Sequence, residues 1–171
     1  MSEQFRRPTH AVRVGRTAIG GDNPIRIQSM TNTPTLDTKA SARQTVSIAR
    51  AGADLVRLTA QGVSHARNLA AIRDAVRAEG CDVPLVADIH FNPAAAFEAA
   101  LHVEKVRINP GNFVDPGRTF KKLEYTDEEY AAELSRIDEK LTPFLELCRE
   151  HGTALRIGVN HGSLSDRIMS R

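Results

Sequence analysis

Residues 55–59 read LVRLT, residues 105–109 read KVRIN and residues 155–160 read LRIGVN. Each segment is short and apolar, as in a buried strand of a parallel sheet, yet each contains one arginine. An unpaired charge inside such a sheet is costly, so an arginine at the same place in three strands predicts a partner of opposite charge. Because the planar guanidinium matches phosphate and carboxylate, the repeat predicts a bound anion.

Strand-like and helix-like segments alternate along the chain. Strands are predicted over 25–30, 55–59, 83–89, 105–109 and 154–160. Helices are predicted over 37–51, 64–79, 93–101 and 126–150, with a further helix from residue 163. Asp37 is expected to cap the first helix, and Thr126 with Glu129 is expected to form a capping box at the start of the fourth. This alternation predicts an α/β fold with helices packed on a parallel sheet.

The predicted units fit the first five of a (β/α)8 TIM-type barrel, which needs about 250 residues in full. The first strand is not followed by Gly-x-Gly-x-x-Gly and the chain has no Walker motif, so a dinucleotide-binding fold is less favoured. Residues 1–24 are predicted as an N-terminal extension with a hairpin, and residues 25–171 as the N-terminal part of the barrel.

Side chains alternate between the two faces of a strand, so parity separates the barrel lumen from the helical layer. The lumen side is predicted to be polar, increasingly so toward the carboxyl ends of the strands, where barrel active sites lie. The residues of this side are Arg26, Gln28, Met30, Arg57, Thr59, Asp88, His90, Lys105, Arg107, Asn109, Arg156, Gly158 and Asn160. The other side is predicted to be apolar and to face the helices, from Ile25 and Ile27 to Ile157 and Val159. A lumen rich in cationic and amide groups suits a compact, highly charged anion such as a diphosphate.

Several candidates also have a structural interpretation. A single strand arginine is often a surface residue or the partner of a buried carboxylate, although three arginines beside Asn109 and Asn160 make this less favoured. Asp88 could pair with a lumen arginine or take part in catalysis. His90, at a strand end, could be a core histidine or a functional one.

Composition excludes some classes of protein. The chain has 171 residues and a formal net charge of +2, and it shows no basic stripe with interleaved aromatic residues, so a nucleic-acid partner is not expected. No apolar run is long enough to cross a bilayer, and residues 1–7 lack the apolar core of a secretory signal. The two separated cysteines, Cys81 and Cys148, predict neither a metal site nor a disulfide framework. We therefore expect a cytoplasmic protein with no membrane partner.

Five strand ends match a known family in order. They read IQSMTNT (27–33), AGADLVR (51–57), VADIHFN (86–92), VRINPGN (106–112) and RIGVNHGSL (156–164). Together they closely resemble the 4-hydroxy-3-methylbut-2-enyl diphosphate synthase family, which belongs to the methylerythritol phosphate route to isoprenoids. The resemblance covers nearly the whole chain from about residue 11.

The resemblance implies an iron-sulfur oxidoreductase that converts 2-C-methyl-D-erythritol 2,4-cyclodiphosphate into 4-hydroxy-3-methylbut-2-enyl diphosphate. The reaction is a reductive ring opening with loss of water. Its two electrons come from flavodoxin or ferredoxin through a 4Fe-4S cluster. In this family the barrel holds the diphosphate, and three cysteines and a glutamate of a separate C-terminal domain hold the cluster. The family forms a homodimer in which the cluster domain of one subunit closes over the barrel of the other.

Carried over to this chain, the resemblance assigns the diphosphate clamp to Arg57, Arg107 and Arg156. His90 would be a phosphate contact or proton donor, with Asp88 as the second catalytic candidate. Hydrogen bonds to phosphate or erythritol oxygens would come from Asn109 and Asn160. Further candidates for substrate binding are Gln28, Met30 and Lys105.

This sequence also departs from the family. Neither Cys81 nor Cys148 lies in the family's cluster motif, so no metal ligand is expected in this chain. The last three barrel strands and the cluster domain are also missing, so the chain is expected to be an N-terminal fragment that is inactive alone. Residues 119–130 lengthen the connection before the fifth strand, as in the large three-domain form of plants and some bacteria. Because no transit peptide is recognisable, the bacterial cytoplasm is the expected location.

Two other interpretations stay open at this point. A different phosphate-handling barrel, similar to dihydropteroate synthase, would bind a pterin diphosphate and would need no cluster. A non-catalytic half barrel would bind anions, or would assemble with a partner through its exposed sheet edge. The iron content of the full-length protein after anaerobic reconstitution separates the dihydropteroate synthase-like barrel from the iron-sulfur enzyme.

Overall fold

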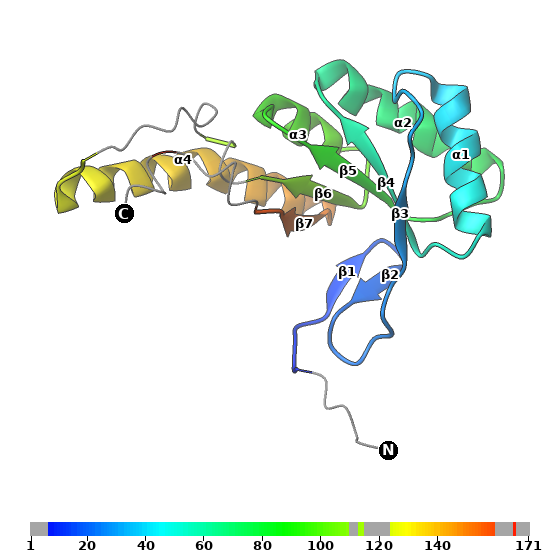
Figure 1. The fold of residues 1–171 in the computed structure, drawn as a ribbon, viewed down its shortest axis with the longest axis horizontal. Helices are drawn as coiled ribbons and strands as arrows, with labels where there is room; N and C mark the ends of the chain where they lie inside the picture. Colours follow the sequence, from blue (N-terminus) through cyan, green and yellow to red (C-terminus); the bar gives the residue numbers. More distant parts are fainter. Residues whose placement is uncertain (1–6, 110–112, 115–123, 160–165, 167–171) are drawn as a thin grey trace.

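A computed structural model describes residues 7–109, 113–114, 124–159 and 166. Five parallel strands form one sheet, in which each strand lies beside the next one along the chain (Figure 1). The strands are β3 (Gln28–Met30), β4 (Leu55–Ala60), β5 (Leu85–Ile89), β6 (Lys105–Ile108) and β7 (Ala154–Ile157). The helices are α1 (Thr38–Arg50), α2 (Val63–Ala78), α3 (Pro93–Ala100) and α4 (Asp127–His151). The predicted α/β alternation is confirmed, and within the described residues the sheet is open, with β3 and β7 at its edges.

Local sequence signals set the starts of two helices. The Asp37 side chain accepts a hydrogen bond from the backbone N–H of Ala40 at 3.0 Å, which caps α1 as predicted. Thr126 and Glu129 make both hydrogen bonds of the predicted capping box at the start of α4. These contacts satisfy backbone N–H groups that have no partner inside a helix.

The first strand of the sheet is shorter than predicted. The prediction of a strand over 25–30 is wrong for its first half, because β3 contains only Gln28–Met30. The Asp54 carboxylate accepts the backbone N–H of Ile27 at 2.8 Å, so a side chain takes this donor instead of a strand neighbour. Ile25 and Ile27 are 82% and 62% exposed and do not face the helices as predicted.

The main core lies between one face of the sheet and the helices. Strand residues of one parity are buried there. The predicted residues of this face are Val56, Leu58, Ala87, Ile89, Val106 and Ile108, and Ala60 and Leu85 are buried with them. The prediction is wrong at the β7 edge, where Ile157 and Val159 are about half exposed. No further strand beyond β7 is present in the described part of the chain to extend the buried layer over them.

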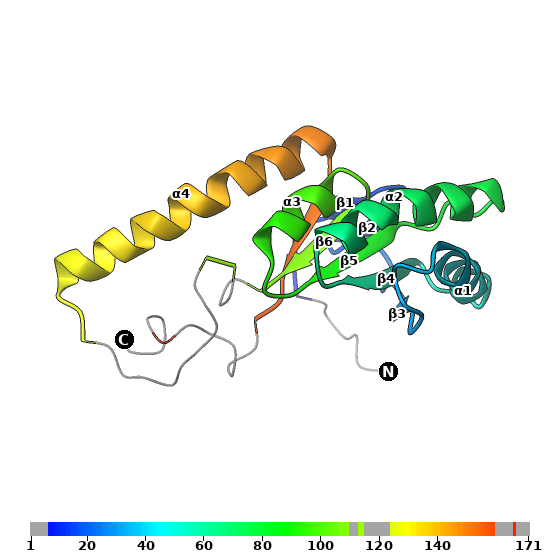
Figure 2. The same ribbon diagram turned by 90° about the horizontal axis from the view of Figure 1, so that it is seen from above.

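Helix α4 is attached to the core by its carboxyl-terminal half. Phe144 and Cys148 are its buried residues, and the ring of Phe144 lies 5.2 Å from that of Phe97 and 5.3 Å from that of Phe113. The amino-terminal half extends past the sheet (Figures 1 and 2), and most of its residues are exposed. The acidic first turn of α4 is therefore a solvated surface.

The predicted N-terminal hairpin is present and packs against the face of the sheet that is turned away from the helices, here called the lumen face. Its strands are β1 (Val12–Val14) and β2 (Thr17–Ile19). Val14 is fully buried against Leu55 and Val86, with Ile19 and Ala154 beside them. Leu55, Val86 and Ala154 lie toward the amino ends of their strands, so the hairpin covers the apolar end of the lumen face.

Candidate anion-binding site

The polar residues of the lumen face lie in two adjacent rows. Strand register joins the upper row in the order Thr59, Asp88, Arg107 and Arg156. The lower row, nearer the amino ends, contains Met30, Arg57, Val86, Lys105 and Ala154. The prediction that the three arginines occupy equivalent places is therefore wrong for Arg57, which lies one row lower. Parity fixes only the face of a residue, whereas the register between neighbouring strands fixes its row.

Arg107 is buried in the upper row and held from three sides. Its Nη1 lies 3.1 Å from Asp88 Oδ1 and 2.8 Å from His90 Nε2. Its Nη2 donates to the carbonyl oxygen of Gly158 at 3.1 Å. The structure thus brings together the predicted residues Asp88, His90 and Arg107, and it fixes the guanidinium in one position.

Arg57 has weaker partners in the lower row. Its Nη2 lies 3.2 Å from the sulfur of Met30, and its Nε lies 3.6 Å from Asp88 Oδ2. A thioether is a weak acceptor, and 3.6 Å is too long for a hydrogen bond. The buried Nε has no hydrogen-bond partner among the described residues. An anion at this place could therefore supply the acceptor that the protein does not.

Lys105 and Arg156 add positive charge without a described counterion. In the part of the chain that the structure describes, neither side chain has an ion pair, and Arg156 is exposed. Burial lowers the pKa of Lys105, and the neighbouring guanidinium groups of Arg156 and Arg57 lower it further. Several cationic side chains therefore lie close together on the lumen face, and a bound anion would reduce the repulsion between them.

A cavity of about 380 Å³ opens between the lumen face and the hairpin. Gln28, Lys105 and Arg156 line it together with Leu55 of the sheet. Its remaining lining residues come from β2 and the segment before β3: Ile19, Gly20, Pro24, Ile25 and Arg26. The cavity therefore joins three sequence-predicted residues that are far apart in the chain.

One candidate, Asn109, lies at the end of a strand. Asn109 follows β6 and is buried (2% exposed), at the carboxyl edge where barrel sites lie. Asn160 lies outside the described residues. The carbonyl of Gly158, which holds Arg107, was not predicted as part of the site, although a glycine on the lumen side of a strand beside an arginine is a signal that could have indicated it.

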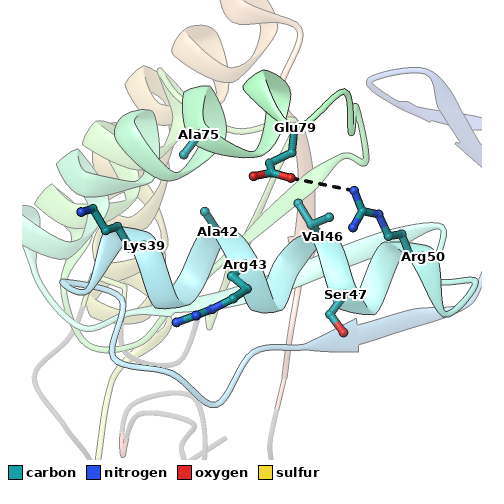
Figure 3. A pocket seen from close by; sticks show the side chains of 8 residues that line it. All are labelled: Lys39, Ala42, Arg43, Val46, Ser47, Arg50, Ala75 and Glu79. Carbon is teal, nitrogen blue, oxygen red and sulfur yellow. Dashed lines mark ion pairs between the residues drawn. The ribbon is translucent and has the colours of Figure 1, made fainter.

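A second hollow lies on the outer, helical layer and is separate from this site. A groove of about 530 Å³ runs between α1 and α2, and the ion pair of Arg50 and Glu79 spans it at 3.9 Å (Figure 3). Lys39 and Arg43 line it over an apolar floor that includes Val46. None of the described candidate residues lines this groove.

Among the residues that the structure describes, no three His, Cys, Asp or Glu side chains gather in a way that could hold a metal ion. Cys148 is buried in the core, where desolvation raises the pKa of its thiol to about 11. None of the described helices is both long and apolar enough to span a membrane.

Replacing Lys105 with Met is expected to stabilise the fold at neutral pH and to weaken binding of inorganic diphosphate on the order of tenfold. The pKa of Lys105 lies below its ordinary 10.5 in the folded state, so its charged form opposes folding at every pH below that folded-state pKa. As the pH rises through the folded-state pKa toward 10.5, the wild-type protein regains this free energy. The advantage of the variant should therefore shrink in alkaline solution.

Urea titrations of the full-length gene product at neutral and alkaline pH, with calorimetry of diphosphate binding, check this expectation. Lys140→Met is the matched control, because Lys140 is exposed on α4 far along the chain from the site. A Lys105→Met variant that is less stable than the wild type at neutral pH contradicts the expectation.

Comparison with known proteins gives one family. The model of the GcpE TIM-barrel domain matches residues 9–171. A curated protein of Bacteroides fragilis is 64% identical over 166 residues, which are 97% of this chain and 26% of that protein. A protein of Akkermansia muciniphila is 57% identical over 166 residues, 97% of this chain and 28% of its own length. Both are named 4-hydroxy-3-methylbut-2-en-1-yl diphosphate synthase (flavodoxin), and this chain spans about a quarter of their length.

Solved structures show a similar fold at low sequence identity. Dihydropteroate synthase of Burkholderia cenocepacia, complexed with 7,8-dihydropteroate, has a TM-score of 0.51 and 16% identity, covering 90% of this chain and 64% of that chain. Dihydropteroate synthase of Xanthomonas albilineans has a TM-score of 0.50 and 16% identity, covering 93% of this chain and 69% of that chain. These likenesses describe the arrangement of strands and helices alone.

Proposed function

Because this chain belongs to the GcpE TIM-barrel domain family, we propose that its full-length gene product is a 4-hydroxy-3-methylbut-2-en-1-yl diphosphate synthase of isoprenoid biosynthesis. In the proposed reaction, one carbon–oxygen bond of 2-C-methyl-D-erythritol 2,4-cyclodiphosphate breaks and its oxygen stays on the phosphate. A hydroxyl group takes up a proton and leaves as water. Two electrons enter, and a carbon–carbon double bond forms.

The observation that carries this proposal is the surplus of cationic side chains on the lumen face. Arg57 and Arg107 share the carboxylate of Asp88, while Lys105 and Arg156 have no described ion pair. Phosphate oxygens of the substrate would complete the coordination of these groups, with bidentate contacts from the guanidinium forks. Gln28 would reach the ligand from the wall of the cavity.

The same cations would act most strongly as the ring opens. The phosphate oxygen that leaves the carbon gains negative charge, and donors already fixed around it stabilise that charge without rearrangement. Arg107 is held by Asp88 and Gly158 before any ligand arrives. Asn109, which follows β6, and Asn160 are assigned to hydrogen bonds with phosphate or erythritol oxygens.

His90 is assigned the proton that the departing hydroxyl needs. Its side chain is 37% exposed at the end of β5, and its Nε2 lies 3.3 Å from Asp88 Oδ1. An imidazole that is partly exposed at a strand end can act as a general acid toward a ligand in the lumen. Asp88 would set the orientation of the imidazole and of both arginines. Met30 would keep Arg57 in place through a contact that a phosphate can easily replace.

The two electrons require a redox group, for which the family resemblance implies a 4Fe-4S cluster. When bound, the cluster would deliver both electrons to the substrate. The described residues offer no ligand set for it, and Cys148 is enclosed in the core. The cationic side chains of the lumen face support substrate binding as the role of this chain, with residues 25–171 as the N-terminal part of the barrel.

The electron donor and assembly are part of the proposal. The curated relatives carry flavodoxin in their name, which supports flavodoxin as the donor. A ferredoxin in its place is the alternative that the family resemblance implies. A homodimer would bring the cluster domain of one subunit over the barrel of the other. The cytoplasm is the proposed location.

The test uses the full-length gene product, purified and reconstituted with iron and sulfide without oxygen. With reduced flavodoxin and the cyclodiphosphate, it is expected to yield 4-hydroxy-3-methylbut-2-enyl diphosphate at several turnovers per cluster. An iron-free protein that binds a pterin diphosphate and leaves the cyclodiphosphate unchanged would overturn the proposal. A protein that binds anions but does not convert the cyclodiphosphate would also overturn the proposal, and would favour a non-catalytic half barrel.

A further inference from the structure

Gly158 occupies a particular place beside the buried arginine of the site. Its backbone N–H donates to the carbonyl oxygen of Ile108 at 2.8 Å, which continues the pairing of β6 and β7. Its own carbonyl oxygen accepts from Arg107 Nη2 at 3.1 Å. Gly158 is not among the glycines with positive φ, so its backbone conformation does not itself require glycine. Another property must explain why a side chain is absent here.

That property is space. A Cβ atom built on Gly158 would lie 2.9 Å from both Cζ and Nη2 of Arg107, and closer still to Nε. Cβ contacts below 3.0 Å are essentially never seen, so a side chain at 158 and the guanidinium in this position exclude each other. The obstacle is the end of a flexible side chain and not backbone. A substitution would therefore displace the guanidinium and leave the strands paired.

We infer that Gly158 is a positioning residue for the site: the absence of its side chain leaves the room in which the guanidinium of Arg107 lies between Asp88, His90 and the 158 carbonyl. The inference rests on the proposed function for its effect on turnover. Displacement would break the contacts of Arg107 with Asp88 at 3.1 Å and with His90 at 2.8 Å together. Errors of about 1 Å in such a constellation cost on the order of a hundredfold in rate.

Gly158→Ala is the direct test in the full-length gene product. Its kcat/KM for the cyclodiphosphate is expected to fall on the order of a hundredfold, and its Kd for inorganic diphosphate to rise about tenfold. Circular dichroism should show an intact fold. Gly62→Ala is the matched control, because a Cβ there would meet its nearest atoms at 3.9 and 4.0 Å, and it is expected to change both constants less than about twofold. Wild-type constants for Gly158→Ala would overturn the inference.

A double-mutant cycle tests whether Gly158 acts through Arg107. Arg107→Ala removes the atoms that the new Cβ would meet, so adding Gly158→Ala to that variant should change Kd and kcat/KM by less than about twofold. If Gly158→Ala lowers affinity and kcat/KM in the Arg107→Ala protein as much as in the wild type, Gly158 does not act through Arg107, and the inference is overturned. If the gene product does not convert the cyclodiphosphate at all, the proposed function fails, while the cycle in diphosphate Kd still tests the role of Gly158.

Discussion

Arg107→Ala is expected to lower turnover of the cyclodiphosphate by the full-length gene product a hundredfold or more. The variant loses a charge-assisted contact to the diphosphate, and such contacts gain strength as the leaving oxygen becomes charged. It also removes the group that joins Asp88, His90 and the Gly158 carbonyl. Both effects act on kcat more than on KM if the interaction is strongest in the transition state. Steady-state kinetics with excess reduced flavodoxin measure the split.

Two further variants separate charge from geometry. Arg107→Lys keeps the charge but cannot donate to Asp88 and to the Gly158 carbonyl through one planar fork, so it should recover only a small part of the lost rate. Arg50→Ala removes an arginine from the outer groove, where its side chain is 70% exposed and 3.9 Å from Glu79, and should leave turnover unchanged. Unchanged kinetics for a folded Arg107→Ala protein would contradict the clamp.

The fold could be predicted from the sequence because the signals that determine it lie within short segments of the chain. Apolar strands of consistent parity alternate with capped helices, and the caps at Asp37 and Thr126 are present as predicted. A parallel sheet of consecutive βα units has few alternative orders, so the neighbours in the sheet followed as well. The same reasoning gave the wrong start for β3, because the contact that takes the Ile27 N–H comes from Asp54, a residue outside that segment.

The sequence indicated which face of the sheet carries the site, but it did not indicate how the site residues are arranged on that face. Parity placed Asp88, His90 and the cations on the lumen side, whereas the offset of Arg57 by one row depends on register between strands, which one strand does not encode. The packing of Val14 under the lumen face also depends on contacts between distant segments. From the sequence, Asp88 could either pair with a lumen arginine or take part in catalysis. In the structure Asp88 forms ion pairs with Arg107 and Arg57, which is the contact that the first interpretation expects.

Asp88→Asn is expected to lower the free energy of unfolding by about 3–5 kcal/mol, because it removes the charge from one partner of a buried ion pair. Asp88 and Arg107 are both buried, at 3.1 Å, so the guanidinium would keep its charge without a described counterion. Arg57 would lose its carboxylate at the same time. Urea or thermal unfolding measures the change. Asp82→Asn is the control, because the side chains of Asp82 and its partner Arg16 are both about two-thirds exposed. This substitution should lower the free energy of unfolding by less than about 1 kcal/mol.

Anion affinity should move in the opposite direction in the same variant. Asp88 repels a diphosphate and competes with it for the guanidinium groups, so its neutral replacement is expected to bind inorganic diphosphate about tenfold more tightly. Saturating diphosphate should then return part of the lost stability, because a ligand that binds only the folded state stabilises it. A purely structural carboxylate, distant from the anion, predicts lower stability with unchanged or weaker affinity. Opposite signs for stability and affinity would therefore place the anion against the same arginines that Asp88 holds in its absence.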